Sequence, residues 1–126
     1  MGLATDQPQP TMEPSPLPQT YWHVVCELAE LTPEHGVTAL VRGIQIAVFR
    51  LYDDRVFAVG NIDPFSGAAV LSRGIVGTRG SAATVTSPLH KQVFDLVTGH
   101  CLDHPQVSVP RYDVRLVNGK VEIGFP

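Results

Sequence analysis

Two segments in the second half of the chain carry residues whose types could do chemistry. Asp63 opens a run that reads Asp-Pro-Phe-Ser-Gly-Ala, and His90 closes a run that reads Ser-Pro-Leu-His from Ser87. A carboxylate beside an imidazole would make the orienting half of a catalytic triad. The nucleophile would then have to be Ser87, but no nucleophile elbow surrounds it. We therefore assign no catalytic residue.

A second group of possible metal ligands follows at His100, Cys101 and His104. Imidazole and thiolate are ligands that zinc prefers, but a zinc site needs three or four converging donors. No matching pair stands elsewhere at a zinc-finger spacing. We assign no metal ligand here and interpret Cys101 as a surface thiol. His90 alone is interpreted as a hydrogen-bonding residue or a contact to a partner.

The two runs resemble the ligand loops of Rieske iron–sulfur domains. In that family one loop reads Cys-Pro-x-His, followed by an aromatic residue, Asp and a Thr-Gly turn, and the run Ser87 to Gly99 matches it apart from the cysteine. The other family loop reads Cys-x-His, followed by Gly-Ala and a leucine, and the run Asp63 to Leu71 is similar. The resemblance covers about Trp22 to Phe125.

Three of the four family ligand positions hold other residues in this chain. A Rieske centre binds one iron through two thiolates and the other through two imidazoles. Asp63 and Ser87 replace the two cysteines, Phe65 replaces one histidine, and only His90 remains. A hydroxyl or a phenyl ring cannot replace these soft donors. The resemblance therefore narrows to the cluster-less branch of the Rieske-like [2Fe-2S] fold, which includes the small subunit of assimilatory NAD(P)H-dependent nitrite reductase.

This resemblance implies a non-catalytic subunit without a cofactor of its own. Its partner would be the nitrite reductase large subunit, which would carry FAD, an iron–sulfur cluster and sirohaem and reduce nitrite to ammonium in nitrate assimilation. In the resembling domains the two loops form an exposed tip, so Phe65, Leu89 and His90 are the expected partner-binding residues. A stand-alone cluster-less binding protein is the alternative, and a Rieske ferredoxin-type electron carrier conflicts with the missing ligands.

Composition restricts the class of protein. The chain has 126 residues with 44% hydrophobic content, which fits one domain with a core of its own. Its net charge is −3 and its basic residues are scattered, so we expect no nucleic-acid partner. No apolar stretch is long enough for a membrane span, and no signal sequence opens the chain, so we expect a cytoplasmic protein. Two cysteines make no disulfide framework.

Residues 1–20 differ in composition from the rest of the chain. They hold five prolines among Gln, Ser and Thr, with few large apolar residues. Such a segment cannot bury enough apolar surface to offset the entropy of ordering it. We therefore predict a disordered Pro-rich tail over 1–20 and one Rieske-like domain over 21–126.

The pattern over 21–126 predicts an all-β fold, a small sandwich or partial barrel with a loop-rich subdomain. Branched and aromatic residues predict strands over 21–26, 37–41, 44–51, 56–59, 83–86, 112–117 and 120–125. Arg42-Gly43 and Asn118-Gly119 predict tight hairpin turns. A helical turn is expected at Glu27 to Leu31, and loops are expected from Gly60 to Gly80 and from Ser87 to Pro105.

Overall fold

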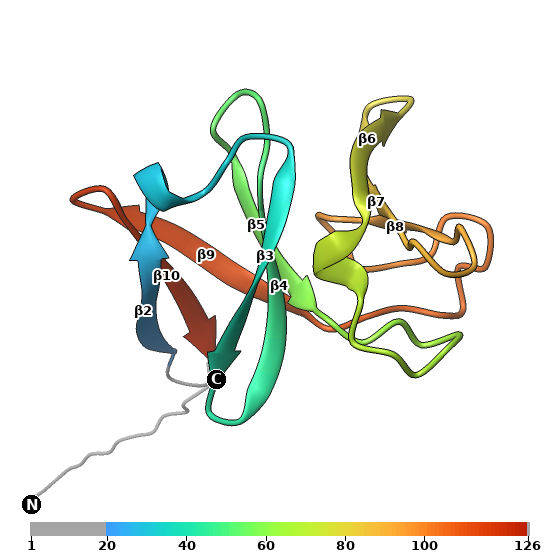
Figure 1. Cartoon of the computed structure of the whole chain (residues 1–126), viewed down its shortest axis with the longest axis horizontal. Coiled ribbons are helices and arrows are strands. Elements are labelled where there is room, and N and C mark those ends of the chain that lie inside the picture. Colours follow the sequence, from blue (N-terminus) through green and yellow to red (C-terminus); the bar gives the residue numbers. More distant parts are fainter. Residues whose placement is uncertain (1–19, 126) are drawn as a thin grey trace, which may run out of the picture.

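The computed structural model describes residues 20–125 and contains strands, two short 3-10 helices and loops (Figure 1). Residues 1–19, which hold nearly all of the predicted tail, lie outside the described residues. The strands are β2 (Tyr21–Glu27), β3 (His35–Val41), β4 (Ile44–Arg50), β5 (Val56–Gly60), β6 (Ile75–Arg79), β7 (Ala82–Thr86), β8 (Val93–Asp95), β9 (Arg111–Val117) and β10 (Lys120–Phe125). The 3-10 helices are η1 (Leu28–Glu30) and η2 (Leu71–Arg73).

The strands form two antiparallel sheets. The larger sheet has six strands in the order β2-β10-β9-β5-β4-β3 and curls into a half-barrel. The smaller sheet has three strands in the order β6-β7-β8 and lies at the other end of the molecule (Figure 1). The all-β prediction is confirmed, and so is the partial barrel with a separate loop-rich part.

Two of the hairpins follow directly from the local sequence. Arg42 and Gly43, between β3 and β4, have φ of 52° and 77°, and Asn118 and Gly119, between β9 and β10, have φ of 52° and 79°. A two-residue turn with positive φ at both positions suits the twist of an antiparallel pair. The flanking strands pair in continuous register from Val41↔Ile44 and from Lys120↔Val117. Both predicted turns are confirmed.

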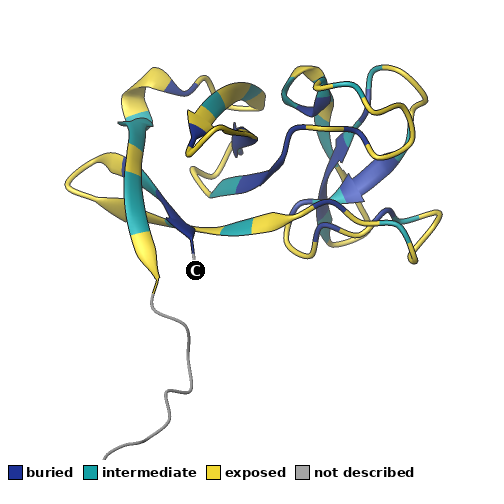
Figure 2. Ribbon diagram, turned by 90° about the horizontal axis from the view of Figure 1, so that it is seen from below, coloured by how far each residue is buried: buried dark blue, intermediate teal, exposed yellow. Residues whose placement is uncertain are grey.

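β4 separates two hydrophobic cores, because both of its faces are buried. Ile46 and Val48 point into the half-barrel with residues of β3, β5 and β10, while Ala47 and Phe49 point toward the small sheet. All four side chains have 0% exposed surface. Figure 2 shows the buried residues concentrated in these two places. The core that contains Ala47 and Phe49 joins the half-barrel to the loops, and it therefore determines where those loops lie.

The first and last strands lie side by side. β2 pairs with β10, and the register places Tyr21 opposite Phe125. The two ends of the domain therefore leave the structure next to each other, at the end of the half-barrel far from the small sheet (Figure 1).

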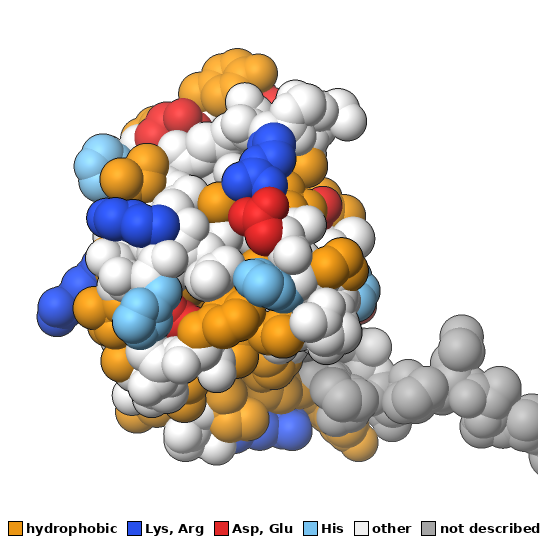
Figure 3. Space-filling model, turned by 90° about the vertical axis from the view of Figure 1, so that its right-hand side faces the viewer, with side chains coloured by type: hydrophobic (Ala, Val, Ile, Leu, Met, Phe, Trp, Pro, Cys, Tyr) orange, Lys and Arg blue, Asp and Glu red, His pale blue; other side chains and the backbone are white. Residues whose placement is uncertain are grey.

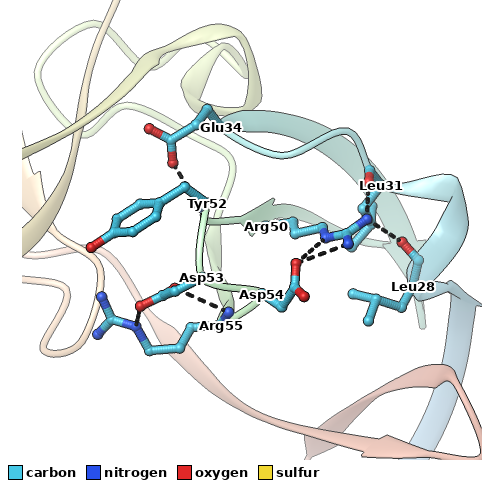
Figure 4. A network of polar contacts seen from close by, with 8 residues as sticks. All are labelled: Leu28, Leu31, Glu34, Arg50, Tyr52, Asp53, Asp54 and Arg55. Carbon is cyan, nitrogen blue, oxygen red and sulfur yellow. Dashed lines mark hydrogen bonds and ion pairs between the residues drawn. The ribbon is translucent and has the colours of Figure 1, made fainter.

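Arg50 ties η1 to the turn between β4 and β5 (Figure 4). Its guanidinium donates to the carbonyl oxygens of Leu28 and Leu31, at 3.2 and 2.8 Å, and to Oδ1 of Asp54 at 2.8 Å. Only 19% of the Arg50 side chain is exposed, so these bonds are partly shielded from water. The predicted helical turn is confirmed as η1. Arg50 donates to the Leu31 carbonyl at the end of this turn and shares the Leu28 carbonyl with the Leu31 amide.

Two strands in the small sheet contradict the predicted loops. β6 lies inside the segment 60–80, and β8 lies inside the segment 87–105. The glycines at 74, 77 and 80 weakened the alternation that predicts a strand, but Gly77 pairs opposite Thr84 within the sheet. Pairing with β7 supplies hydrogen bonds that the local pattern of β6 does not reveal.

Candidate functional site

Asp63 and Ser87 bring the two loops together. Ser87 Oγ donates a hydrogen bond of 2.6 Å to Oδ2 of Asp63, and both residues have 0% exposed surface. Asp63 follows β5, and Ser87 follows β7, so each strand end delivers one of the two groups. The carboxylate–imidazole pair considered for Asp63 and His90 is not formed, because His90 lies exposed while Asp63 is buried against Ser87.

The carboxylate of Asp63 also organises the first loop. Its Oδ1 accepts a hydrogen bond of 2.8 Å from the amide of Phe65, so each of its two oxygens accepts one hydrogen bond. The Asp63 amide donates to the carbonyl of Ala68 at 2.9 Å, and its carbonyl accepts from the Gly67 amide at 2.7 Å. These bonds close the loop into a compact turn. The buried aspartate is therefore satisfied within the loop and by Ser87.

Ser87 holds the start of the second loop in the same way. Its amide donates to the Gln92 carbonyl at 2.8 Å, and its Oγ accepts a long bond of 3.4 Å from the Leu89 amide. The residues between these anchors project outward: Leu89 is 49% exposed and His90 is exposed. Lys91 turns the chain back with φ of 59°.

Phe65 lies between the loops and is partly open to solvent. Its ring centroid is 6.2 Å from that of Phe94 and 5.5 Å from that of His104, yet 37% of the residue is exposed. We call Phe65, Leu89 and His90 the tip surface. Figure 3 views the end of the molecule that holds the small sheet and shows apolar side chains with histidines beside them. The packing of His104 on Phe65 could not be predicted from the sequence, because that contact depends on how distant loops pack.

His100, Cys101 and His104 do not converge. Cys101 has 0% exposed surface, and its Sγ lies 3.7 Å from Oε1 of Gln92. His100 Nδ1 lies 3.1 Å from the carbonyl oxygen of Pro105, while His104 packs on Phe65. The interpretation of Cys101 as a surface thiol is wrong, because the residue belongs to the core beside the small sheet. Over residues 20–125, no three His, Cys, Asp or Glu side chains gather as a metal site would require.

The residues at the four resembling ligand positions do not fit a Rieske cluster. The two thiolate positions hold a carboxylate and a hydroxyl that bind each other at 2.6 Å. One imidazole position holds Phe65, whose ring contacts Phe94. Such a donor set lacks the thiolates that hold the cluster and keeps only one imidazole.

Comparison with known proteins identifies the class of protein. The Rieske-like [2Fe-2S] domain family matches residues 21–124. The chain therefore belongs to the Rieske-like domain family. Within it, the chain groups with small subunits of nitrite reductase: the Salmonella typhimurium "Nitrite reductase (NADH) small subunit" is 45% identical over 103 residues, which cover 81% of this chain and 95% of that relative.

Solved structures agree with this grouping. A Mycobacterium tuberculosis chain, provisionally described as an NADH-dependent nitrite reductase small subunit, superposes with a TM-score of 0.84 and 50% identity. The match covers 86% of this chain and 98% of that chain. The predicted Rieske-like fold is confirmed.

A similar domain also occurs inside a larger protein. The Klebsiella oxytoca "Nitrite reductase [NAD(P)H] large subunit" is 39% identical over 108 residues. These residues cover 86% of this chain but only 11% of that relative, so the match is to one small part of a long chain.

In the described residues of this chain, no helix has the length and apolar character needed to cross a membrane.

Proposed function

We propose that this chain is the small subunit of a cytoplasmic NAD(P)H-dependent nitrite reductase, and that it docks on a large subunit without taking part in the chemistry. The large subunit would carry the FAD, the iron–sulfur cluster and the sirohaem, and would reduce nitrite to ammonium. This chain would hold no cofactor and would support the assembled enzyme.

The observation that carries the proposal is the distribution of the domain among its relatives. A domain similar to this chain occurs as a separate small subunit in Salmonella typhimurium and as about a tenth of a large subunit in Klebsiella oxytoca. A domain that occurs both separately and joined to one partner is expected to work beside that partner in either form.

The tip surface is the proposed contact. Loops on a rigid scaffold commonly carry binding residues, and an aromatic side chain surrounded by apolar groups is a typical anchor of an interface. Phe65 is 37% exposed and Leu89 is 49% exposed, whereas Asp63 and Ser87, two residues before each of them, are fully buried. The Asp63–Ser87 hydrogen bond fixes the two loops that present them.

Co-purification with the large subunit tests the proposal. We expect a Phe65→Ala, His90→Ala variant to remain folded and to be recovered poorly with a tagged large subunit. The matched control is Tyr52→Ala, His35→Ala, which removes an exposed aromatic ring and an exposed histidine that lie outside the two loops. The control should be recovered like the unmodified chain.

Two outcomes would contradict the proposal. If the unmodified chain does not associate with the large subunit, the chain is a stand-alone binding protein. If the double variant is recovered normally, the docking surface lies elsewhere on the domain. Nitrite-dependent oxidation of NADH or NADPH, measured with and without the small subunit, then shows whether association changes the activity of the large subunit.

A further inference from the structure

An uncharged groove lies beside the first loop, where the half-barrel meets the loop region. Its walls are Ile44 at the start of β4, Ile62 after β5, and Pro110 and Tyr112 at the start of β9. We call these four residues the apolar groove. The cavity has a volume of about 330 Å³, and its other lining residues are glycine, glutamine and asparagine, so no charged side chain lines it.

Tyr112 packs against the half-barrel core, whereas the two isoleucines of the groove are not used by either core. Ile44 is 43% exposed and Ile62 is 53% exposed, and neither belongs to the two clusters of buried side chains. Single exposed apolar residues are ordinary on a protein surface. Two isoleucines that face a shared, uncharged hollow are less ordinary, because charge depletion is typical of the centre of an interface.

The base of the groove is held rigidly. Asn61 has 1% exposed surface, and its Nδ2 donates to Oε1 of Gln45 at 3.2 Å. Its Oδ1 accepts from the Ser72 amide at 2.8 Å. The Asn61 amide also donates to the Gln45 carbonyl at 3.1 Å. A hollow that is already formed costs a partner less ordering on binding.

We propose that an apolar side chain of the nitrite reductase large subunit inserts into the apolar groove and forms a second anchor of the interface. The inference rests on the proposed function. It is favoured by continuity, because Ile62 of the groove lies three residues before Phe65 of the tip surface in the same loop, and three residues span at most about 11 Å. The bonds of Asp63 hold Ile62 and Phe65 in a fixed relation within that loop.

A single charge at Ile62 tests the groove directly. We expect Ile62→Asp to weaken binding to the isolated large subunit about ten-fold or more, because a buried apolar anchor is replaced by a charge that must lose its water. The matched control is Ile75→Asp on β6, since Ile75 is 70% exposed and lies in the small sheet away from the groove. Ile75→Asp should bind within about two-fold of the unmodified chain. Isothermal titration gives the affinities, and thermal unfolding confirms that both variants are folded.

The remaining outcomes separate this inference from the proposed function. If Phe65→Ala weakens binding and folded Ile62→Asp does not, the groove is not an anchor, although the docking proposal stands. If the unmodified chain does not bind the large subunit, both fail. If Ile62→Asp leaves binding to the large subunit unchanged but lowers the sedimentation coefficient of the chain alone, the groove is filled by a second copy and the inference is overturned. A milder variant, Ile62→Ser, should also bind more weakly, and it replaces Ile62→Asp if the latter fails to fold.

Discussion

The Ser87 hydroxyl donates a 2.6 Å hydrogen bond to the Asp63 carboxylate, and neither residue keeps any exposed surface. These are the two positions that the family resemblance assigns to thiolates on one iron. In the described structure, a hydrogen bond therefore links the loops where a metal would link them in a Rieske centre. The bond is short and fully buried, so removing either partner leaves a buried polar group without its hydrogen bond.

Removing the Asp63 carboxylate should destabilise the domain. Asp63→Ala leaves the Ser87 hydroxyl and the Phe65 amide without their acceptor, at an expected cost of about 1–3 kcal/mol. For a domain of this size, each kcal/mol lowers Tm by about 4–8 °C. Asp63→Asn should cost less, because its amide can accept from Phe65 and donate to Ser87. Thermal unfolding measures both, and an unchanged Tm for Asp63→Ala would show that the buried bond contributes nothing net.

The purified chain should contain neither iron nor acid-labile sulfide and should be colourless. The physical reason is that Asp63, Phe65 and Ser87 stand at three of the four ligand positions. Elemental analysis and visible absorption test this, with a Rieske ferredoxin prepared in parallel as the positive control. Absorption bands of a bound cluster in the anaerobically purified chain would contradict the prediction.

Substitutions in the tip surface should affect the stability of the domain and its binding to the large subunit to different extents. Phe65→Ala removes a ring that packs on Phe94 and His104, so it should lower Tm modestly as well as weaken binding. His90→Ala removes an exposed side chain, and its effect on stability should stay within about 0.5 kcal/mol. Denaturant unfolding and binding to the large subunit should be measured on the same samples. A large loss of stability for His90→Ala would show that the residue has a structural role.

Arg50→Ala should destabilise the domain more than Arg55→Ala. Arg50 donates to the carbonyl of Leu31, and to that of Leu28, which also accepts from the Leu31 amide. Only 19% of its side chain is exposed, so its loss should cost about 1–3 kcal/mol. The ion pair of Arg55 is exposed and should contribute less than about 1 kcal/mol. Urea unfolding of the two variants makes the comparison. Equal losses would mean that the carbonyl contacts of Arg50 are not stabilising.

Stability should fall in alkaline solution. Burial, together with the nearby carboxylate of Glu30, raises the pKa of the Cys26 thiol, and burial raises the pKa of Tyr112. The unfolded chain then loses these protons at lower pH than the folded chain, so this stability is complete below about pH 8.5 and declines as pH rises through the raised values. Cys26→Ala should flatten the decline that begins above about pH 8.5. An identical pH profile for the variant would contradict this.

Local sequence predicted some parts of the fold and missed others for physical reasons. The Arg42-Gly43 and Asn118-Gly119 turns were predictable because positive φ is a property of the turn residues themselves. The Asp63–Ser87 bond joins residues 24 positions apart, and only packing brings them together. The Rieske ligand pattern marked both positions as important but did not reveal that their replacements would bind each other.

The pairing of Tyr21 with Phe125 allows the whole domain to be inserted into, or fused to, a longer chain. Because both ends emerge side by side, a longer chain can be joined at either end, or at both, without separating strands of the sheet. The tip surface remains outside such a junction, since the ends leave at the far side of the half-barrel. The apolar groove lies closer to it, because the ring of Tyr112 packs on that of Phe125 with the centroids 5.1 Å apart. One fold can thus serve as a free subunit in one organism and as a segment of a longer polypeptide in another, with the choice between them made at the level of gene fusion.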